Sequence, residues 1–147
     1  MPTNRAPKSP RPKSRTATPS EIAPGVYVGG WKDALKFDGT RFCVLEEAPP
    51  DMPAATHIAI YDEATDRADV ANLDRLAKTM ISARARGEPV LVFCGHGVRR
   101  SPLGAAWYLR RAERISLDAA YERVRSVRPR VEHARDWVGN AADLERA

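Results

Sequence analysis

Residues 90–102 read VLVFCGHGVRRSP, and this stretch decides the fold and the site that the fold carries. Its first four residues are apolar, which is typical of a strand buried on both faces of a parallel sheet. The strand ends at Cys94, and a short loop with two glycines leads to Pro102, which suits the first turn of a helix. The stretch therefore predicts a strand, a tight loop and a helix in succession.

The loop after Cys94 has the composition of an anion-binding cradle. Gly95 and Gly97 allow the backbone to fold closely around a ligand, and successive backbone N–H groups above a helix N-terminus attract anions. The planar guanidinium of Arg100 can bind two phosphate oxygens. The same positive field favours the thiolate form of Cys94, so one loop can hold a phosphate above a nucleophile. A buried, inert cysteine beside solvated arginines is the alternative interpretation.

Strands alternate with helices along the rest of the chain. The expected strands cover residues 26–28, 42–45, 56–61 and 89–93. The expected helices cover residues 33–37, 70–86, 102–112, 117–126 and 134–146, the second of them closed by Gly87. We therefore expect an α/β fold in which helices flank a central, mostly parallel sheet of four to five strands.

The charge of the chain is concentrated at its N-terminus. The 147 residues carry 24 Lys and Arg against 19 Asp and Glu, a net charge of +5. Residues 1–20 hold five basic residues, no acidic residue and five of the 12 prolines. We expect them to form a disordered tail on a formally neutral domain that covers residues 21–147. This tail is either a solubilising extension or a weak contact for an acidic partner or nucleic acid.

Composition and spacing argue against several classes of protein. No apolar stretch approaches the roughly 20 residues that span a bilayer, and the N-terminus lacks the apolar region of a secretory signal. Cys43 and Cys94 form no C-x-x-C motif, and the three histidines show no metal-ligand spacing. Neither a zinc site nor a disulfide framework is therefore expected. We expect a monomer in the reducing cytoplasm, with no membrane segment, metal or cofactor.

The motif Cys94-x5-Arg100-Ser101, with Gly97 three residues after the cysteine, resembles the signature of cysteine-dependent protein tyrosine phosphatases. The small size of the chain points to their dual-specificity branch. Residues 26–30 (VYVGG) resemble the opening strand of that branch, and residues 120–129 resemble its helix that ends in an arginine–proline pair. The resemblance implies a dual-specificity-phosphatase-like fold. It also implies a loop that binds the substrate phosphate, formed by Gly95, His96, Gly97, Val98, Arg99 and Arg100.

The resemblance further implies the catalytic residues. Cys94 would be the nucleophile, Arg100 would hold the phosphate, and Ser101 would stabilise the departing thiolate. The family's general acid is an aspartate in a loop after a strand. Asp62, which lies 32 residues before the cysteine, fits this position, and Asp66 is the alternative. The implied activity is hydrolysis of phosphotyrosine, extending to phosphoserine and phosphothreonine in proteins, through a phosphocysteine intermediate.

Three features leave alternatives open. Phe93 stands where the family usually has a histidine that orients the loop and favours the thiolate, so a weakly active, phosphate-binding module is one alternative. His96, two residues after the cysteine, resembles the loop of metal-independent RNA 5′-triphosphatases of the same superfamily, and Arg99 is a second base next to Arg100 that would suit a polyanionic substrate. An RNA 5′ end, a phosphoinositide or another polyphosphate is therefore the alternative substrate. A disulfide between Cys43 and Cys94, similar to one that protects the nucleophile in some relatives, is also left open.

Overall fold

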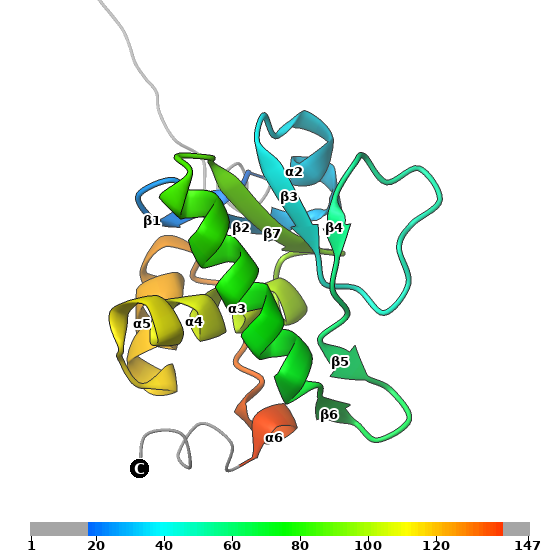
Figure 1. The fold of residues 1–147 in the computed structure, drawn as a ribbon. Helices are drawn as coiled ribbons and strands as arrows, with labels where there is room; N and C mark the ends of the chain where they lie inside the picture. Colours follow the sequence, from blue (N-terminus) through cyan, green and yellow to red (C-terminus); the bar gives the residue numbers. More distant parts are fainter. Residues whose placement is uncertain (1–17, 140–147) are drawn as a thin grey trace, which may run out of the picture.

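A five-stranded sheet forms the centre of the computed structural model, which describes residues 18–139 (Figure 1). Its strands, in spatial order, are β1 (Ser20–Ala23), β2 (Val26–Gly30), β7 (Val90–Cys94), β3 (Thr40–Cys43) and β4 (Thr56–His57). β1 runs antiparallel to β2, and all other neighbours are parallel. The expected α/β fold with a mostly parallel sheet of four to five strands is confirmed, although β1 was not predicted.

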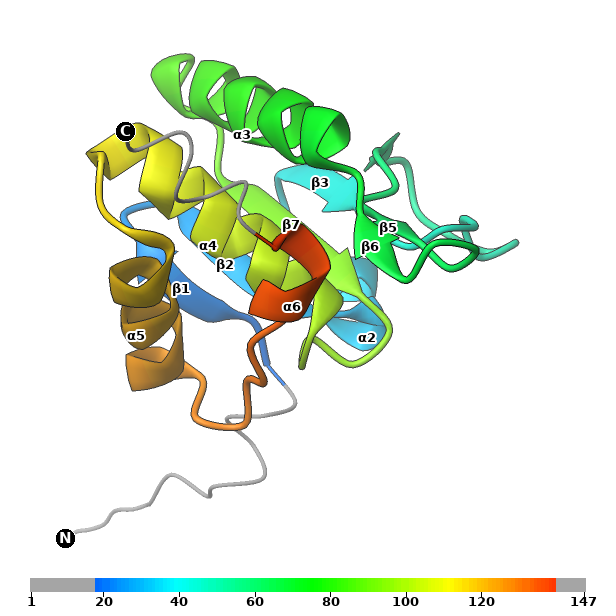
Figure 2. The ribbon, with the colours of Figure 1, turned by 90° about the horizontal axis from the view of Figure 1, so that it is seen from below.

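Helices cover both faces of this sheet. α3 (Val70–Ala85), α4 (Arg100–Glu113) and α5 (Leu117–Val127) pack on one face, and α2 (Trp31–Lys36) packs on the other (Figures 1 and 2). The residues of β7 alternate between these two cores. Since successive strand residues point to opposite faces, a strand between two helical layers must be apolar throughout. All five residues of β7 are accordingly buried.

A separate hairpin stands beside the central sheet. It consists of β5 (Tyr61–Asp62) and β6 (Arg67–Ala68), and it lies next to α6 (Arg135–Val138) in both views (Figures 1 and 2). The predicted strand over residues 56–61 is therefore wrong in its length, because β4 already ends at His57. Ile58 and Ile60 are nevertheless fully buried. The alternation of apolar residues in this segment thus reflects buried side chains that continue past the last residue of the strand.

The structure covers the expected tail and the expected last helix only in part. Residues 1–17 of the expected tail lie outside the described residues, and Ser20 begins β1. The helix predicted over residues 134–146 appears as α6 and ends before Gly139, which adopts a φ of 56°. The remainder of that predicted helix lies outside the described residues. Within residues 18–139, no helix has the length and apolar character needed to cross a membrane.

Candidate active site

The loop between β7 and α4 lies at the carboxyl edge of the sheet, where parallel α/β sheets place their ligands. β7 is flanked by β2 and β3, and its last residue is Cys94. α4 begins at Arg100, so residues 95–99 connect the strand to the helix. We call this segment loop 95–99. It places the candidate nucleophile near the N-terminus of a 14-residue helix, whose dipole favours negative charge.

The backbone of loop 95–99 is held from outside by its carbonyl oxygens. Four consecutive carbonyls accept hydrogen bonds from donors elsewhere in the chain. The donor–acceptor pairs and their N···O distances are Trp31 N to Gly95 O (3.0 Å), Arg128 Nη2 to His96 O (3.3 Å), Arg128 Nε to Gly97 O (2.8 Å) and Glu132 N to Val98 O (2.9 Å). In a planar trans peptide the C=O and the following N–H point in opposite directions. The amides of residues 96–99 therefore point away from these outer partners, into the loop.

Glycines allow the loop to lie directly on β2. Gly97 has a φ of 71°, and a Cβ there would stand 2.5 Å from Arg128 Nη2 and 2.7 Å from the carbonyl carbon of Gly29. A Cβ on Gly30 would stand 2.8 Å from Gly95 O. Such approaches are too close for any side chain. The sequence indicated the Gly29–Gly30 pair only as the end of a strand. In the structure, loop 95–99 packs directly against the backbone of this pair.

Inside the loop, Cys94 meets two hydrogen-bonding groups. Its Sγ accepts a hydrogen bond from Gly97 N at 3.3 Å and lies 3.2 Å from Ser101 Oγ. Ser101 Oγ also donates to Gly29 O at 2.9 Å. A hydroxyl has one proton, so it can satisfy Gly29 O or turn toward a thiolate, but it cannot do both fully. The structure thus brings the predicted nucleophile and Ser101 together as a pair.

Arg128 is a residue of this site that the sequence did not identify. It is only 3% exposed, and besides two carbonyls of loop 95–99 its guanidinium contacts Thr18 O and Ser20 Oγ. Burial lowers the pKa of Arg128, while the nearby charges of Asp33 and Cys94 favour its charged form. The arginine–proline pair at the end of a helix was the only sequence signal. Its role as the anchor of a distant loop depends on tertiary structure.

Arg100 stands at the mouth of the loop with an acidic partner. Its Nε contacts Glu46 Oε1 at 3.0 Å, and both side chains are about one-third exposed, at 34% and 29%. Its Cζ lies 5.2 Å from the ring centroid of Tyr61, a cation–π distance. Glu46 follows β3, outside every element that the sequence predicted. Sequence patterns carried no signal for this ion pair.

The two candidate general acids lie on the β5–β6 hairpin in different environments. Asp62 is exposed, and its Oδ1 accepts a hydrogen bond from Ala64 N at 3.0 Å. Asp66 accepts a 2.6 Å hydrogen bond from the hydroxyl of Tyr61, and this bond raises the pKa of Tyr61. Within residues 18–139, the side chain of Asp62 has no hydrogen bond or ion pair with loop 95–99. The hairpin contacts the site through Tyr61, the neighbour of Asp62, whose ring lies beside Arg100, and the carboxylate of Asp66 is engaged by Tyr61.

The two unusual side chains of loop 95–99 point to different surroundings. His96 is exposed. Arg99 contacts α6, where its Nη2 lies 3.4 Å from Asp136 Oδ1 and its Cζ lies 4.4 Å from the ring centroid of Trp137. Arg99 is thus engaged with the protein itself, which weakens the interpretation that it binds a second phosphate.

Phe93 and Cys43 belong to the core on the α2 side of the sheet. Phe93 is fully buried with Ala34, Cys43 and Leu91, and its ring centroid lies 6.4 Å from that of Trp31. Cys43 is opposite Phe93 in the β3–β7 pairing, and burial raises the pKa of the Cys43 thiol. Cys94 belongs to the core on the opposite face, and both cysteines are free. This arrangement separates the two thiols by the thickness of the sheet.

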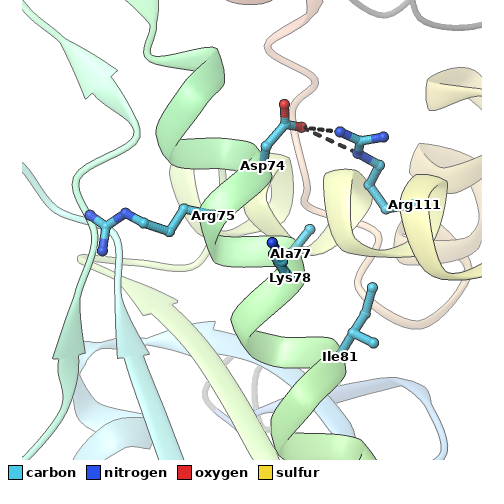
Figure 3. Close-up of a pocket in the computed structure, with 6 residues that line it drawn as sticks. All are labelled: Asp74, Arg75, Ala77, Lys78, Ile81 and Arg111. Carbon is cyan, nitrogen blue, oxygen red and sulfur yellow. Dashed lines mark hydrogen bonds and ion pairs between the residues drawn. The ribbon is translucent and has the colours of Figure 1, made fainter.

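A groove elsewhere on the surface is separate from this site. It has a volume of about 660 Å³ and lies along α3, with Arg111 of α4 on its other side (Figure 3). Asp74 and Arg111 form an ion pair across it at 3.0 Å. None of its lining residues belongs to loop 95–99 or the hairpin. Within the described residues, no cluster of three or more His, Cys, Asp or Glu side chains could hold a metal.

The sequence of the chain matches a family and several of its members. Residues 48–146 match the family model described as dual specificity phosphatase, catalytic domain. The rat dual specificity protein phosphatase 12 is 27% identical over an alignment of 130 residues, which covers 80% of this chain and 38% of that protein. The human dual specificity phosphatase 28 is 28% identical over an alignment of 118 residues, which covers 74% of this chain and 66% of that protein. The chain spans about two fifths of the length of the first of these relatives.

Solved structures share the fold at lower identity. The crystal structure of human DUSP28 has a TM-score of 0.75 and 23% identity, and the match covers 97% of this chain and all of that one. The human tyrosine phosphatase-like serine/threonine/tyrosine-interacting protein has a TM-score of 0.70 and 16% identity, with 88% of this chain and 96% of that chain covered. At these identities the likeness establishes the fold.

Proposed function

Because this chain belongs to the family of dual specificity phosphatase catalytic domains, we propose that it is a phosphatase that hydrolyses phosphomonoesters in proteins. The main proposed substrate is phosphotyrosine, and the proposal extends to phosphoserine and phosphothreonine. The relatives that carry this name support the class of reaction. The residues of this chain support how the reaction would proceed.

The arrangement of loop 95–99 around Cys94 carries the proposal. Four loop carbonyls are bonded outward, so the following amides point inward around the sulfur. Preorganised N–H groups of this kind stabilise the charge that develops on the equatorial oxygens of a transferring phosphoryl group. Arg100 adds a guanidinium at the mouth of the loop, and its ion pair with Glu46 engages Nε. The other guanidinium N–H groups suit phosphate oxygens.

The proposed reaction has two steps. The Cys94 thiolate attacks phosphorus, the bond between phosphorus and the ester oxygen breaks, and Asp62 gives its proton to that leaving oxygen. A water molecule then attacks the phosphocysteine and gives a proton to Asp62. The S–P bond breaks, and Ser101 turns its hydroxyl toward the departing thiolate, from which it lies 3.2 Å away. The products are an alcohol or phenol and inorganic phosphate.

The contacts of Arg99 favour a phosphomonoester over a polyphosphate. A second phosphate needs a second cation facing the substrate, and Arg99 instead contacts Asp136 and Trp137. Glu46 also places a carboxylate beside Arg100 at the mouth of the loop, and negative charge there opposes a polyanion. We therefore propose a phosphoprotein substrate rather than an RNA 5′ end.

The proposal is tested with p-nitrophenyl phosphate in the presence of a chelator. We expect metal-independent turnover that Cys94→Ser abolishes, while Cys43→Ser, the same change at the other free cysteine, retains it. Turnover that survives Cys94→Ser, or that needs a divalent ion, would refute the proposal. Binding of phosphate without turnover would identify a phosphate-binding module. A comparison of phosphotyrosine, phosphoserine and triphosphorylated RNA substrates then defines the substrate class.

A further inference from the structure

We propose that Trp137 of α6 is a positioning residue that holds the β5–β6 hairpin, and with it Asp62, over loop 95–99. The inference rests on the proposed function, because it assigns the general acid to Asp62. It adds a part that lies outside the motif: a short helix close to the end of the described chain that links the two halves of the active site.

The hairpin needs support from outside. Each of its strands has two residues, and the hairpin is not part of the central sheet. Isolated two-stranded hairpins are marginally stable at best. The hydrogen bonds of the Asp62 side chain stay within its own turn. The position of Asp62 relative to loop 95–99 must therefore be set by its neighbours in the hairpin.

α6 provides this support through an aromatic contact and a hydrogen bond. The rings of Tyr61 and Trp137 are 4.1 Å apart between centroids, with an angle of 30° between their planes. Tyr61 directly precedes Asp62 in the chain. On the other strand, Arg67 Nη1 donates to Asp136 O at 3.3 Å. Trp137 is 6% exposed, so its ring is packed against these neighbours rather than free in solvent.

Trp137 and Asp136 of α6 also contact loop 95–99. The guanidinium carbon of Arg99 lies 4.4 Å from the ring centroid of Trp137, and Arg99 Nη2 lies 3.4 Å from Asp136 Oδ1. The guanidinium carbon of Arg100 lies 5.9 Å from the same ring. Trp137 thus contacts the residue before the candidate acid and the two arginines at the end of the cradle.

A loss of this link should act on protonation of the leaving group. A displacement of about 1 Å at an active site can reduce a rate about 100-fold, because the reacting groups no longer meet. Attack by Cys94 depends on the backbone of loop 95–99, whose carbonyls at Gly95 and Gly97 are held by Trp31 and Arg128 and not by α6. Displacement of Asp62 should therefore slow esters with poor leaving groups most and leave phosphate binding in place.

The test compares kcat/KM for phenyl phosphate and p-nitrophenyl phosphate. Phenolate leaves poorly and needs the proton, whereas p-nitrophenolate leaves readily. We expect Trp137→Ala to lower kcat/KM for phenyl phosphate by about 10–100-fold and to have a severalfold smaller effect on p-nitrophenyl phosphate. The alkaline decline of the pH–rate profile should also flatten, as in Asp62→Asn. In the Asp62→Asn background, Trp137→Ala should not further change the ratio of kcat/KM for phenyl phosphate to kcat/KM for p-nitrophenyl phosphate.

Matched variants separate positioning from general loss of structure. Arg135→Ala alters the same helix at a side chain that pairs with Asp118 of α5, and it should keep the wild-type ratio. Tyr61→Leu removes the other ring of the contact and should reproduce the effect of Trp137→Ala, whereas Tyr61→Phe keeps the ring and should not. If Trp137→Ala fails to fold, the Tyr61 pair decides the question.

The outcomes distinguish this inference from the proposed function. Wild-type protein that hydrolyses neither ester would refute the proposed function. Wild-type activity with an equal slowing of both esters in Trp137→Ala and Tyr61→Leu, while inorganic phosphate still raises the melting temperature of both variants, would refute the positioning role alone.

Discussion

The glycine at position 97 combines two demands in one residue. Its φ of 71° lies in the left-handed region, and the space where a Cβ would stand is filled by Arg128 and the backbone of Gly29. The backbone strain alone costs about 1–2 kcal/mol for an L-residue. The steric overlap adds a displacement of the loop, so the residue controls the geometry of the cradle as well as its stability.

Gly97→Ala should therefore lose activity out of proportion to stability. We expect kcat/KM to fall by about 100-fold or more, because the inward amides lose their positions. Gly87→Ala is the matched control: its φ is 81°, but a Cβ there meets nothing within 4 Å. It should lose about 1–2 kcal/mol of unfolding free energy and keep full activity. Equal activity losses in both variants would show that strain, and not the packing of the loop, is decisive.

Asp33 gives the stability of the protein a specific pH dependence. The carboxylate is buried and accepts a hydrogen bond from Gly30 N at 2.9 Å. Gly30 itself lies against loop 95–99. Burial raises the pKa of Asp33, although the bond from Gly30 and the charge of Arg128 oppose this. The folded protein then binds more protons than the unfolded chain between the ordinary and the raised pKa. Stability must fall as the pH rises through that window.

Asp33→Asn should remove this loss while it keeps an acceptor for Gly30 N. We expect the variant to be more stable than the wild type at neutral pH, and the difference to disappear as the pH falls below about 4, where both side chains are neutral. Urea unfolding at a series of pH values measures it, and Asp38→Asn, the same change at an exposed position, is the control. A variant that is less stable at neutral pH would show that attraction to Arg128 outweighs burial.

Among the elements, β7 contributes side chains to both hydrophobic cores, one on each face of the sheet. Val90, Val92 and Cys94 face the helical layer that carries α4, and Leu91 and Phe93 face α2. Phe93 directly precedes the nucleophile in the sequence, but its side chain lies on the other face of the sheet. A change at Phe93 should therefore act on packing before it acts on the thiolate.

Phe93→His should destabilise the protein without a catalytic gain. Histidine would be a buried polar group among apolar neighbours, at a cost of about 1–3 kcal/mol. For a domain of this size that lowers the melting temperature by roughly 3 °C per kcal/mol. The measurements are thermal melts and the rate of Cys94 alkylation by iodoacetamide against pH, with Phe93→Leu as an apolar control. Faster alkylation at acidic pH with an unchanged melting temperature would instead restore the electrostatic role of the family's histidine.

At the scale of the whole molecule, charge and site are separated in the sequence. The five basic residues that account for the net charge of +5 all lie in residues 1–20. The proposed anion site, in contrast, is built from backbone amides and Arg100 within the neutral part of the chain. Binding of a small oxyanion should therefore depend on the domain, and the tail should matter only for large polyanions.

Inorganic phosphate should accordingly stabilise the protein through the domain. Linkage predicts about 1.4 kcal/mol at a phosphate concentration ten times the Kd. Replacement of the five tail bases (Arg5, Lys8, Arg11, Lys13 and Arg15) by glutamine should leave the rise in melting temperature unchanged, and Arg100→Met should greatly reduce it. Loss of the rise in the glutamine variant would place the tail in the binding site.

The sequence alone determined the central strand, loop 95–99 and the helix that follows, because these residues are contiguous and their geometry is local. Apolar character throughout residues 90–93 indicated a strand covered on both faces, and the motif around Cys94 pointed to the family. The local pattern could not fix where β4 ends: Ile58 and Ile60 alternate as in a strand, but they are buried beyond its last residue.

Only the tertiary structure decided which distant residues complete the site. Arg128 and Trp137 lie in segments whose sequence indicated a helix end and a helix, and Glu46 lies outside every element that the sequence predicted. Each acts through a contact with a residue more than 30 positions away. The same holds for Gly30, whose missing side chain matters because loop 95–99 lies against it, and for Gly29, where a Cβ would meet Asp33. Such contacts arise from the packing of the whole chain, and local sequence periodicity carries no record of them.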